Sequence, residues 1–214
     1  ETVLKSGRPQ TVSKDLMRDL GMCCGGQMEV FVERVQARLR LHLVGAGHVA
    51  QAVAQVAAVA GYEVHVYDDR DPLLEHPAFV DSTVHCAEAD EVSRKIATGD
   101  VRDAFLIMTR DHLLDEQALA DVVLLPHAYV GMIGSRRKVY RVLGRMLRRF
   151  DERGLARPDM SRVRAPIGLD LGGRTPGEIA VSVMAELLAA RHGGSAGAMS
   201  VVQDAVERAG EVEG

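Results

Sequence analysis

The chain has 214 residues, of which 47% are hydrophobic and 26% are charged, and its formal net charge at pH 7 is −4. This composition predicts a folded protein of one large domain, or of one domain and part of a second, and argues against a disordered chain. The acidic balance argues against a general nucleic-acid binder, and no apolar run reaches the ~20 residues that a membrane-spanning helix needs.

The N-terminal segment starts at Glu1 and contains neither the apolar stretch nor the small-residue cleavage pattern of a secretory signal. We therefore expect a fragment of a cytoplasmic protein rather than a secreted chain. The three cysteines are Cys23, Cys24 and Cys86, which are too few for a disulfide framework. In a reducing compartment a free thiol can act as a metal ligand or as a nucleophile.

Residues 1–26 are polar and too short to form a core, and residues 27–35 alternate apolar and polar side chains as a strand does when one face is more buried than the other. We predict that residues 1–38 are the end of a small, truncated domain. Cys23 and Cys24 lie side by side in the glycine-rich turn before this strand. Three interpretations of the pair stay open: metal or persulfide chemistry, two small buried side chains, or a strained vicinal disulfide.

From residue 39 the pattern changes to a strand, a turn into a helix and a second strand, which is a βαβ arrangement. Later apolar runs and amphipathic segments continue this alternation. The predicted strands are 39–45, 62–69, 83–86, 104–109 and 128–133, and the predicted helices are 45–61, 88–97, 112–122 and 135–153. The alternation predicts an α/β, Rossmann-like, doubly wound domain with a mainly parallel sheet over residues 39–192.

A capping box marks the start of the last predicted helix of this domain. It runs from Thr175 to Glu178, with Pro176 as the first helical residue. The helix is expected to end near His192. Residues 193–214 are mostly small and polar, so we expect them to form a flexible tail.

The sequence GAGHVA at residues 45–50 joins the first predicted strand of the domain to its first helix. Gly45 permits the tight turn, and Gly47 lets the backbone approach a pyrophosphate. Asp68 ends the next strand, where a carboxylate accepts hydrogen bonds from ribose hydroxyls. The pattern predicts a nucleotide or a related phosphate ligand, with a Rossmann turn that has lost its ligand as the alternative. Asp68 and Asp69 disfavour a ribose 2′-phosphate, but Arg70 follows them directly, so the choice between NAD and NADP stays open.

The sequence GSRRK at residues 134–138 closes a later strand and begins a helix. Ser135 can cap this helix while free backbone N–H groups face an anion. A basic stripe continues along the helix and consists of Arg137, Arg141, Arg145 and Arg148. This stripe is either a solvated face or an electropositive wall for a phosphate-bearing cofactor or an acidic partner.

His112 and Asp115 lie three residues apart at a helix start that follows a predicted strand, so they could face one pocket. An Asp–His pair at such a position is more often part of a helix cap than of a catalytic site. No serine or cysteine has the sequence context of a triad nucleophile, so acyl transfer has little support.

Several stretches together resemble the XdhC/CoxI family, the accessory proteins that mature xanthine dehydrogenase and related molybdenum hydroxylases. They are GMCCGGQMEVFVE at 21–33, HLVGAGHVA at 42–50, VYDDR at 66–70, YVGMIGSRRK at 129–138 and APIGLDLGGRTPGEIAVSVMAELLAAR at 165–191. Their combination is far more specific than any single motif. Thr109-Arg110 stands where the family often has Thr-His, so no family role is carried over to Arg110.

The resemblance implies a chaperone that binds the molybdenum cofactor and protects it while a cysteine desulfurase installs its sulfido ligand. The chaperone would then insert the cofactor into a molybdenum hydroxylase such as xanthine dehydrogenase, with Cys23 or Cys24 as the metal ligand. We also expect a homodimer. The predicted cofactor-binding residues are Cys23, Cys24, Gly45, Gly47, His48, Asp68, Gly134, Ser135, Arg136 and Lys138. The alternatives are an NAD(P)-dependent oxidoreductase of Rossmann type and an assembly module that docks a dehydrogenase without carrying the cofactor.

Overall fold

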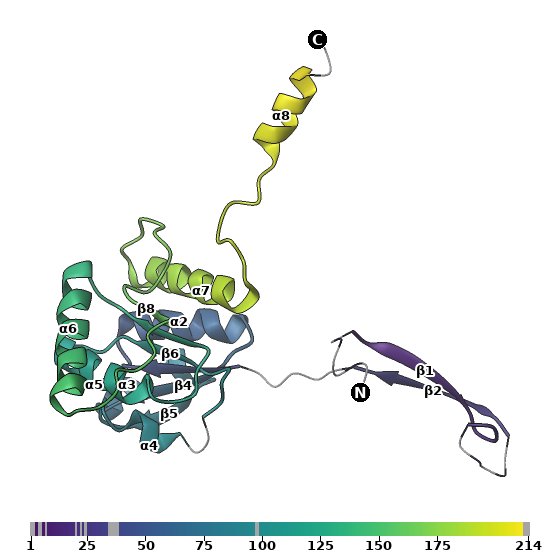
Figure 1. Cartoon of the computed structure of the whole chain (residues 1–214), viewed down its shortest axis with the longest axis horizontal. Coiled ribbons are helices and arrows are strands. Elements are labelled where there is room, and N and C mark those ends of the chain that lie inside the picture. Colours follow the sequence, from purple (N-terminus) through teal and green to yellow (C-terminus); the bar gives the residue numbers. More distant parts are fainter. Residues whose placement is uncertain are drawn as a thin grey trace. The chain divides into compact units, whose positions relative to one another are not determined.

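The computed structural model divides the chain into two compact units, residues 1–38 and 39–214 (Figure 1). It describes residues 3, 6, 8–19, 21, 23, 25–33, 39–96 and 99–211. Cys24, one of the two predicted metal ligands, lies outside the described residues. Each unit contains a β-sheet of its own.

The first unit contains a β-hairpin. Strand β1 (Gln10–Asp15) pairs in antiparallel fashion with β2 (Gln27–Val32), and Val12 lies opposite Val30. The sequence predicts β2 but not β1, whose residues are mostly polar. Phe31 is 63% exposed and Val30 on the other face is 40% exposed, so the faces differ but neither is buried.

The second unit is built on a six-stranded parallel sheet with the strand order β5-β4-β3-β6-β7-β8. The strands are β3 (Arg40–Val44), β4 (Glu63–Asp68), β5 (Thr83–Cys86), β6 (Ala104–Ile107), β7 (Tyr129–Met132) and β8 (Val163–Arg164). The predicted doubly wound, Rossmann-like fold is therefore confirmed. Strand β8 was not predicted because it has two residues and one apolar side chain.

Helices cover both faces of the sheet. On one face α2 (His48–Val59) lies beside α7 (Pro176–His192), and on the other α5 (His112–Val122) lies beside α6 (Arg136–Glu152) (Figure 1). The shorter helices are α3 (Asp71–Leu74), the 3₁₀ helix η1 (Pro77–Phe79), α4 (Val92–Lys95) and α8 (Val202–Glu211). Among the described helices, none has the length and apolar character that crossing a membrane requires.

Two apolar clusters form the core, one on each side of the sheet. Leu41 and Leu43 of β3 point into the cluster under α2 and α7, and Phe105 and Ile107 of β6 point into the cluster under α5 and α6. All four residues of β6 are buried, as expected for a central strand with helices on both faces. The core therefore fixes the positions of the loops at the strand ends.

Three predictions from the sequence have different outcomes in the structure. The capping box of Thr175 and Glu178 is present with both of its hydrogen bonds. The helix predicted over residues 88–97 is wrong in length, because α4 covers Val92–Lys95 and Val92 is its one buried residue. The segment 193–214 contains α8, which the sequence did not predict, whereas the flexibility of this tail stays a prediction.

Candidate functional site

Open parallel sheets bind ligands beyond the carboxyl ends of their strands, at the point where the strand order reverses. Here the reversal lies between the neighbouring strands β3 and β6, whose chain connections run to opposite sides of the sheet. The loops that follow β3, β4, β6 and β7 meet at this edge. Four predicted site residues of the glycine fingerprint, Gly45, Gly47, His48 and Asp68, lie there.

Gly45 allows the β3–α2 turn to pass close to β6. Its φ is +111°, and a Cβ atom built on it would lie 2.5 Å from the carbonyl oxygen of Met108. Its N–H donates to the carbonyl of Tyr67 at 2.7 Å. A side chain at position 45 would therefore collide with backbone, which is why the turn requires glycine.

Gly47 and His48 form the N-terminus of α2. Gly47 is the N-cap residue and has ordinary extended backbone angles, φ −71° and ψ 179°, and no side chain caps the helix. No atom of the described residues lies within 4 Å of a Cβ built on Gly47. The first turn carries no acidic residue. The free N–H groups of this turn can therefore donate hydrogen bonds to an anion, although ligand contacts of Gly47 and His48 stay predictions.

Asp68 is already fully engaged by protein groups. The carboxylate is 6% exposed and accepts hydrogen bonds from the N–H of Ala46 at 2.8 Å and of Arg70 at 3.1 Å. It also accepts from the Arg70 guanidinium at 2.8 and 2.9 Å. Asp68 thus holds the glycine turn against the end of β4. Its predicted contact with a ribose stays a prediction, and a ribose would have to displace Arg70.

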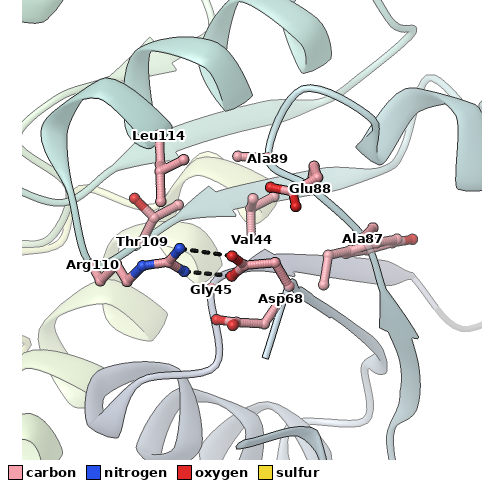
Figure 2. A pocket seen from close by; sticks show the side chains of 11 residues that line it. Val44, Gly45, Asp68, Ala87, Glu88, Ala89, Thr109, Arg110 and Leu114 are labelled. Atoms are coloured by element: carbon pink, nitrogen blue, oxygen red, sulfur yellow. Dashed lines mark hydrogen bonds and ion pairs between the residues drawn. The ribbon is translucent and has the colours of Figure 1, made fainter. Parts of the chain in front are cut away.

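Arg110 and Asp69 close this edge of the sheet. The guanidinium donates two hydrogen bonds to the carboxylate (dashed lines in Figure 2). One of them joins Nη2 to Oδ2 at 2.7 Å. This interaction lowers the pKa of Asp69 to about 2. The pair borders a pocket that Gly45, Asp68 and Thr109 also line (Figure 2). Sequence reasoning missed this pair because its members lie 41 positions apart.

The buried carboxylate of Asp115 connects the loop after β6 to the first turn of α6. It is 0% exposed and accepts from Thr109 at the N–H (3.1 Å) and at the hydroxyl (2.7 Å). It also forms an ion pair with Lys138. His112 instead lies beside Asp111, with Nδ1 at 3.6 Å from Oδ2. The prediction that His112 and Asp115 face one pocket is therefore wrong, because Asp115 is taken up by this internal network.

The second predicted motif caps α6. Gly134 has a φ of +153°, and the Ser135 hydroxyl accepts from the N–H of Lys138 at 3.2 Å. Arg136 is exposed, whereas the Lys138 ammonium is paired with Asp115. Of the two predicted cationic ligands of an anion in this motif, Arg136 is thus the one that the described contacts leave available for binding.

Part of the basic stripe of α6 is structural. Arg145 donates to the buried carboxylate of Glu116 at 2.5 Å, and Arg149 Nη1 lies 2.9 Å from its other oxygen. Arg137, Arg141 and Arg148 are exposed. Arg145, together with Arg149 beside the stripe, therefore neutralises a buried charge, whereas the other three arginines of the stripe face solvent.

Cys23 belongs to the first unit and lies in the turn that links β1 to β2. The N–H of Leu16 donates to the carbonyl of Gly26 at 2.9 Å and closes this turn. The thiol of Cys23 is free and exposed. Within the described part of the chain, no cluster of three or more His, Cys, Asp or Glu side chains could hold a metal ion. The metal-ligand role of Cys23 stays a prediction.

Comparison with known proteins assigns the family. Residues 41–187 match the family described as the XdhC Rossmann domain. The chain belongs to the XdhC family. The match covers the glycine turn, the Arg110–Asp69 pair, the α6 motif and most of α7, so the predicted resemblance is confirmed.

Three relatives extend the XdhC match. The uncharacterized protein YqeB of Escherichia coli K12 is 36% identical over 180 residues, which are 84% of this chain and 32% of YqeB. A probable xanthine dehydrogenase subunit of Bacillus subtilis is 27% identical over 76% of this chain and 46% of its own length. The molybdenum cofactor insertion chaperone PaoD of E. coli K12 is 26% identical over 72% of this chain and 40% of its own length. The chain thus spans less than half the length of each of these relatives.

A solved structure from Bacillus halodurans, described as a xanthine dehydrogenase, has the same fold. It superposes with a TM-score of 0.62 and 18% identity, over 90% of this chain and 78% of that one. At this level of identity the likeness concerns the fold alone. Neither the XdhC relatives nor the occupied carboxylate of Asp68 supports the NAD(P) alternative.

Proposed function

We propose that this protein binds the molybdenum cofactor and delivers it to a molybdenum hydroxylase related to xanthine dehydrogenase. The observation that carries this proposal is membership of the XdhC family over residues 41–187, together with relatives named for cofactor insertion and for xanthine dehydrogenase. Sulfuration of the bound cofactor by a cysteine desulfurase, and its insertion into the recipient enzyme, are parts of the same proposal.

The exposed thiol of Cys23 fits the metal end of this cargo. Thiolates are soft ligands that suit transition metals, and the open turn around Cys23 lets a large group approach. Cys24 has the same chemistry by sequence. We propose that one of these two cysteines binds the molybdenum.

The Rossmann unit offers donors to the anionic part of the cofactor. The N-terminus of α2 has free N–H groups at Gly47 and His48, and Arg136 adds an exposed cation at the start of α6. Phosphate groups bind well to such helix ends and to guanidinium groups. We therefore propose that the phosphate of the cofactor binds at the carboxyl edge of the sheet.

The test is a cofactor-binding assay with cysteine variants of this chain. Cys23→Ala, Cys24→Ala and the double variant are compared with Cys86→Ala, which removes the third cysteine, also exposed. The purified proteins are incubated anaerobically with isolated molybdenum cofactor, and the retained molybdenum and pterin are quantified after gel filtration. The double variant should lose the cofactor, and Cys86→Ala should retain it.

The single variants decide which cysteine is the ligand. A double variant that retains stoichiometric cofactor would overturn the cysteine assignment, and wild-type protein without any affinity would overturn the function. Transfer is measured as activation of a cofactor-free molybdenum hydroxylase by the loaded protein. The desulfurase partner, the homodimer and the cytoplasmic location stay predictions.

A further inference from the structure

A pocket of about 350 Å³ is lined by the loop between β8 and α7 and by the start of α7, and its described lining residues do not include the glycine turn. This volume falls in the range of about 300–1,000 Å³ that is usual for small-molecule sites. Its walls combine the apolar side chains of Ile167, Leu169 and Ile179 with the charged residues Asp170 and Arg174. Apolar walls with a few polar groups are typical of sites for small organic ligands.

The first part of this loop is fixed to the sheet and to α7. The N–H of Ile167 donates to the last carbonyl of β7 at 3.1 Å, and the N–H of Gly168 donates to the Glu186 carboxylate at 2.6 Å. The Ser182 hydroxyl donates to the carbonyl of Leu169 at 2.5 Å. Gly168 has a φ of +102°, and a Cβ there would lie 2.5 Å from Ser182 Oγ. The pocket floor is therefore preformed.

The second part of the loop is held by the capping box of α7. The Glu178 carboxylate accepts from the N–H groups of Arg174 and Thr175, each at 2.9 Å. The N-terminus of α7 thus already holds a carboxylate of its own and is not an anion site by itself. Recognition of a ligand in this pocket therefore depends on side chains.

Asp170 and Arg174 both line the pocket, and their side chains are without a partner. Both residues are exposed, and within the described residues neither side chain forms a hydrogen bond or an ion pair, with the other or with a third residue. A carboxylate and a guanidinium in one preformed pocket present an acceptor pair and a donor fork to a ligand. Such an arrangement fits a flat heterocycle that has donors on one edge and acceptors on another.

We propose that this pocket binds the pterin ring of the cofactor, an inference that rests on the proposed function. The 2-amino-4-oxo edge of a pterin carries two adjacent N–H donors, which the Asp170 carboxylate accepts. Arg174 donates to the neighbouring 4-carbonyl oxygen, and the aliphatic walls contact the faces of the ring. Guanine has the same donor edge, so the test includes a guanine nucleotide.

The experiment titrates the full chain with free pterin and with lumazine, in which an oxygen replaces the 2-amino group. Binding is followed by quenching of ligand fluorescence and by calorimetry. Asp170→Asn and Arg174→Gln are compared with Asp81→Asn and Arg148→Gln, which change exposed charges outside the pocket. Wild-type protein should prefer pterin over lumazine by about tenfold or more, because lumazine presents an acceptor to the carboxylate.

The specificity of Asp170→Asn separates recognition from folding. This variant should bind pterin about tenfold more weakly and lose the preference over lumazine, because the asparagine amide can donate to the added oxygen. The two control variants should bind as wild type does. Equal affinity for pterin and lumazine in the wild type, or an unchanged preference in Asp170→Asn, overturns the proposal, and tighter binding of GMP than of pterin reassigns the pocket to guanine nucleotides.

Two results keep this inference separate from the proposed function. Cys23→Ala/Cys24→Ala should bind free pterin normally, because the described residues that line the pocket come from the loop before α7 and from α7 itself. Protein that carries and transfers the cofactor but shows no effect of Asp170→Asn refutes the pterin pocket and leaves the function standing. Protein that binds pterin through Asp170 but never carries molybdenum refutes the function instead.

Discussion

The guanidinium of Arg110 and the carboxylate of Asp69 form a two-bond ion pair that joins the ends of β6 and β4 over β3, the strand between them. Together with the contacts of Asp68 to Arg70, this pair occupies the carboxylates that a Rossmann site would offer to a ribose. The domain therefore keeps an uncapped, open helix start at Gly47, whereas it uses the carboxylates of the fingerprint internally.

The Arg110–Asp69 pair should contribute little to stability despite its geometry. Both side chains are partly exposed, 43% and 23%, and exposed ion pairs contribute about 0.2–1 kcal/mol. A double-mutant cycle with Asp69→Asn and Arg110→Ala, measured by urea unfolding, should give a coupling energy in this range. Because the folded pKa of Asp69 is about 2, below its usual value of 3.8, this coupling is present above pH 3.8 and is lost as the pH falls through 2. Independent effects of the two substitutions at pH 7 would contradict the pair.

Asp115 should matter far more to stability than any exposed acid. Its replacement by alanine leaves the Lys138 ammonium, which is 24% exposed, without its partner and removes the acceptor of the Thr109 N–H. Breaking a fully buried pair costs about 3–5 kcal/mol, and because this cation is partly solvated we expect a loss of about 2–3 kcal/mol. Urea unfolding of Asp115→Ala should show a loss of this order. Asp115→Asn keeps an acceptor for Thr109 and should lose less, and the exposed Asp81→Asn should be neutral. A loss below about 1 kcal/mol for Asp115→Ala would contradict the network.

Local patterns explain which parts of this fold the sequence could predict. Strands β3 to β7 of the second unit, the turn at Gly45 and the Thr175 capping box depend on neighbouring residues and were predicted, whereas the two-residue strand β8 was not. Contacts between distant residues decide the rest. The residues around Asp115 in the sequence do not indicate its ion pair with Lys138. The pocket beside Asp170 likewise depends on how one loop packs on α7.

His42 should make the protein less stable in mildly acidic solution. It is buried between the rings of His65 and Phe105, at centroid distances of 5.1 and 4.7 Å, and its Nδ1 lies 3.0 Å from the Tyr67 hydroxyl. Burial, together with the charges of His65, Arg40 and His85, lowers its pKa from 6.5 to about 3. The unfolded chain binds a proton below pH 6.5 that the folded chain does not accept until about pH 3.

The stability that His42 contributes in its neutral form is therefore complete above pH 6.5 and decreases as the pH falls toward 3. The decrease is about 1.4 kcal/mol per pH unit for one proton. Urea unfolding between about pH 7 and 4.5 should show a smaller slope for His42→Gln than for the wild type. Val59→Ala, at an exposed position without an ionisable group, should keep the wild-type slope. Equal slopes for the wild type and His42→Gln would mean that His42 is protonated in the folded protein.

Gly45 and Gly47 form a matched pair for testing the glycine turn. Gly45→Ala forces a side chain into a positive φ and against the Met108 carbonyl, so it should lower the free energy of unfolding by about 2 kcal/mol or more. Gly47→Ala meets no atom of the described residues and has allowed backbone angles, so its effect should stay within about 1 kcal/mol. Its new methyl group instead enters the space in front of the α2 N–H groups.

The two substitutions should therefore separate stability from anion binding. Thermal unfolding with and without inorganic pyrophosphate should show stabilisation of the wild type, which Gly47→Ala loses while it keeps its ligand-free midpoint. Val59→Ala, at an exposed position near the other end of α2, serves as the control and should keep the pyrophosphate effect. If pyrophosphate stabilises Gly47→Ala as much as the wild type, anions do not bind at Gly47. The phosphate of the cofactor would then have to bind elsewhere on the carboxyl edge, and Arg136 would be the next residue to substitute.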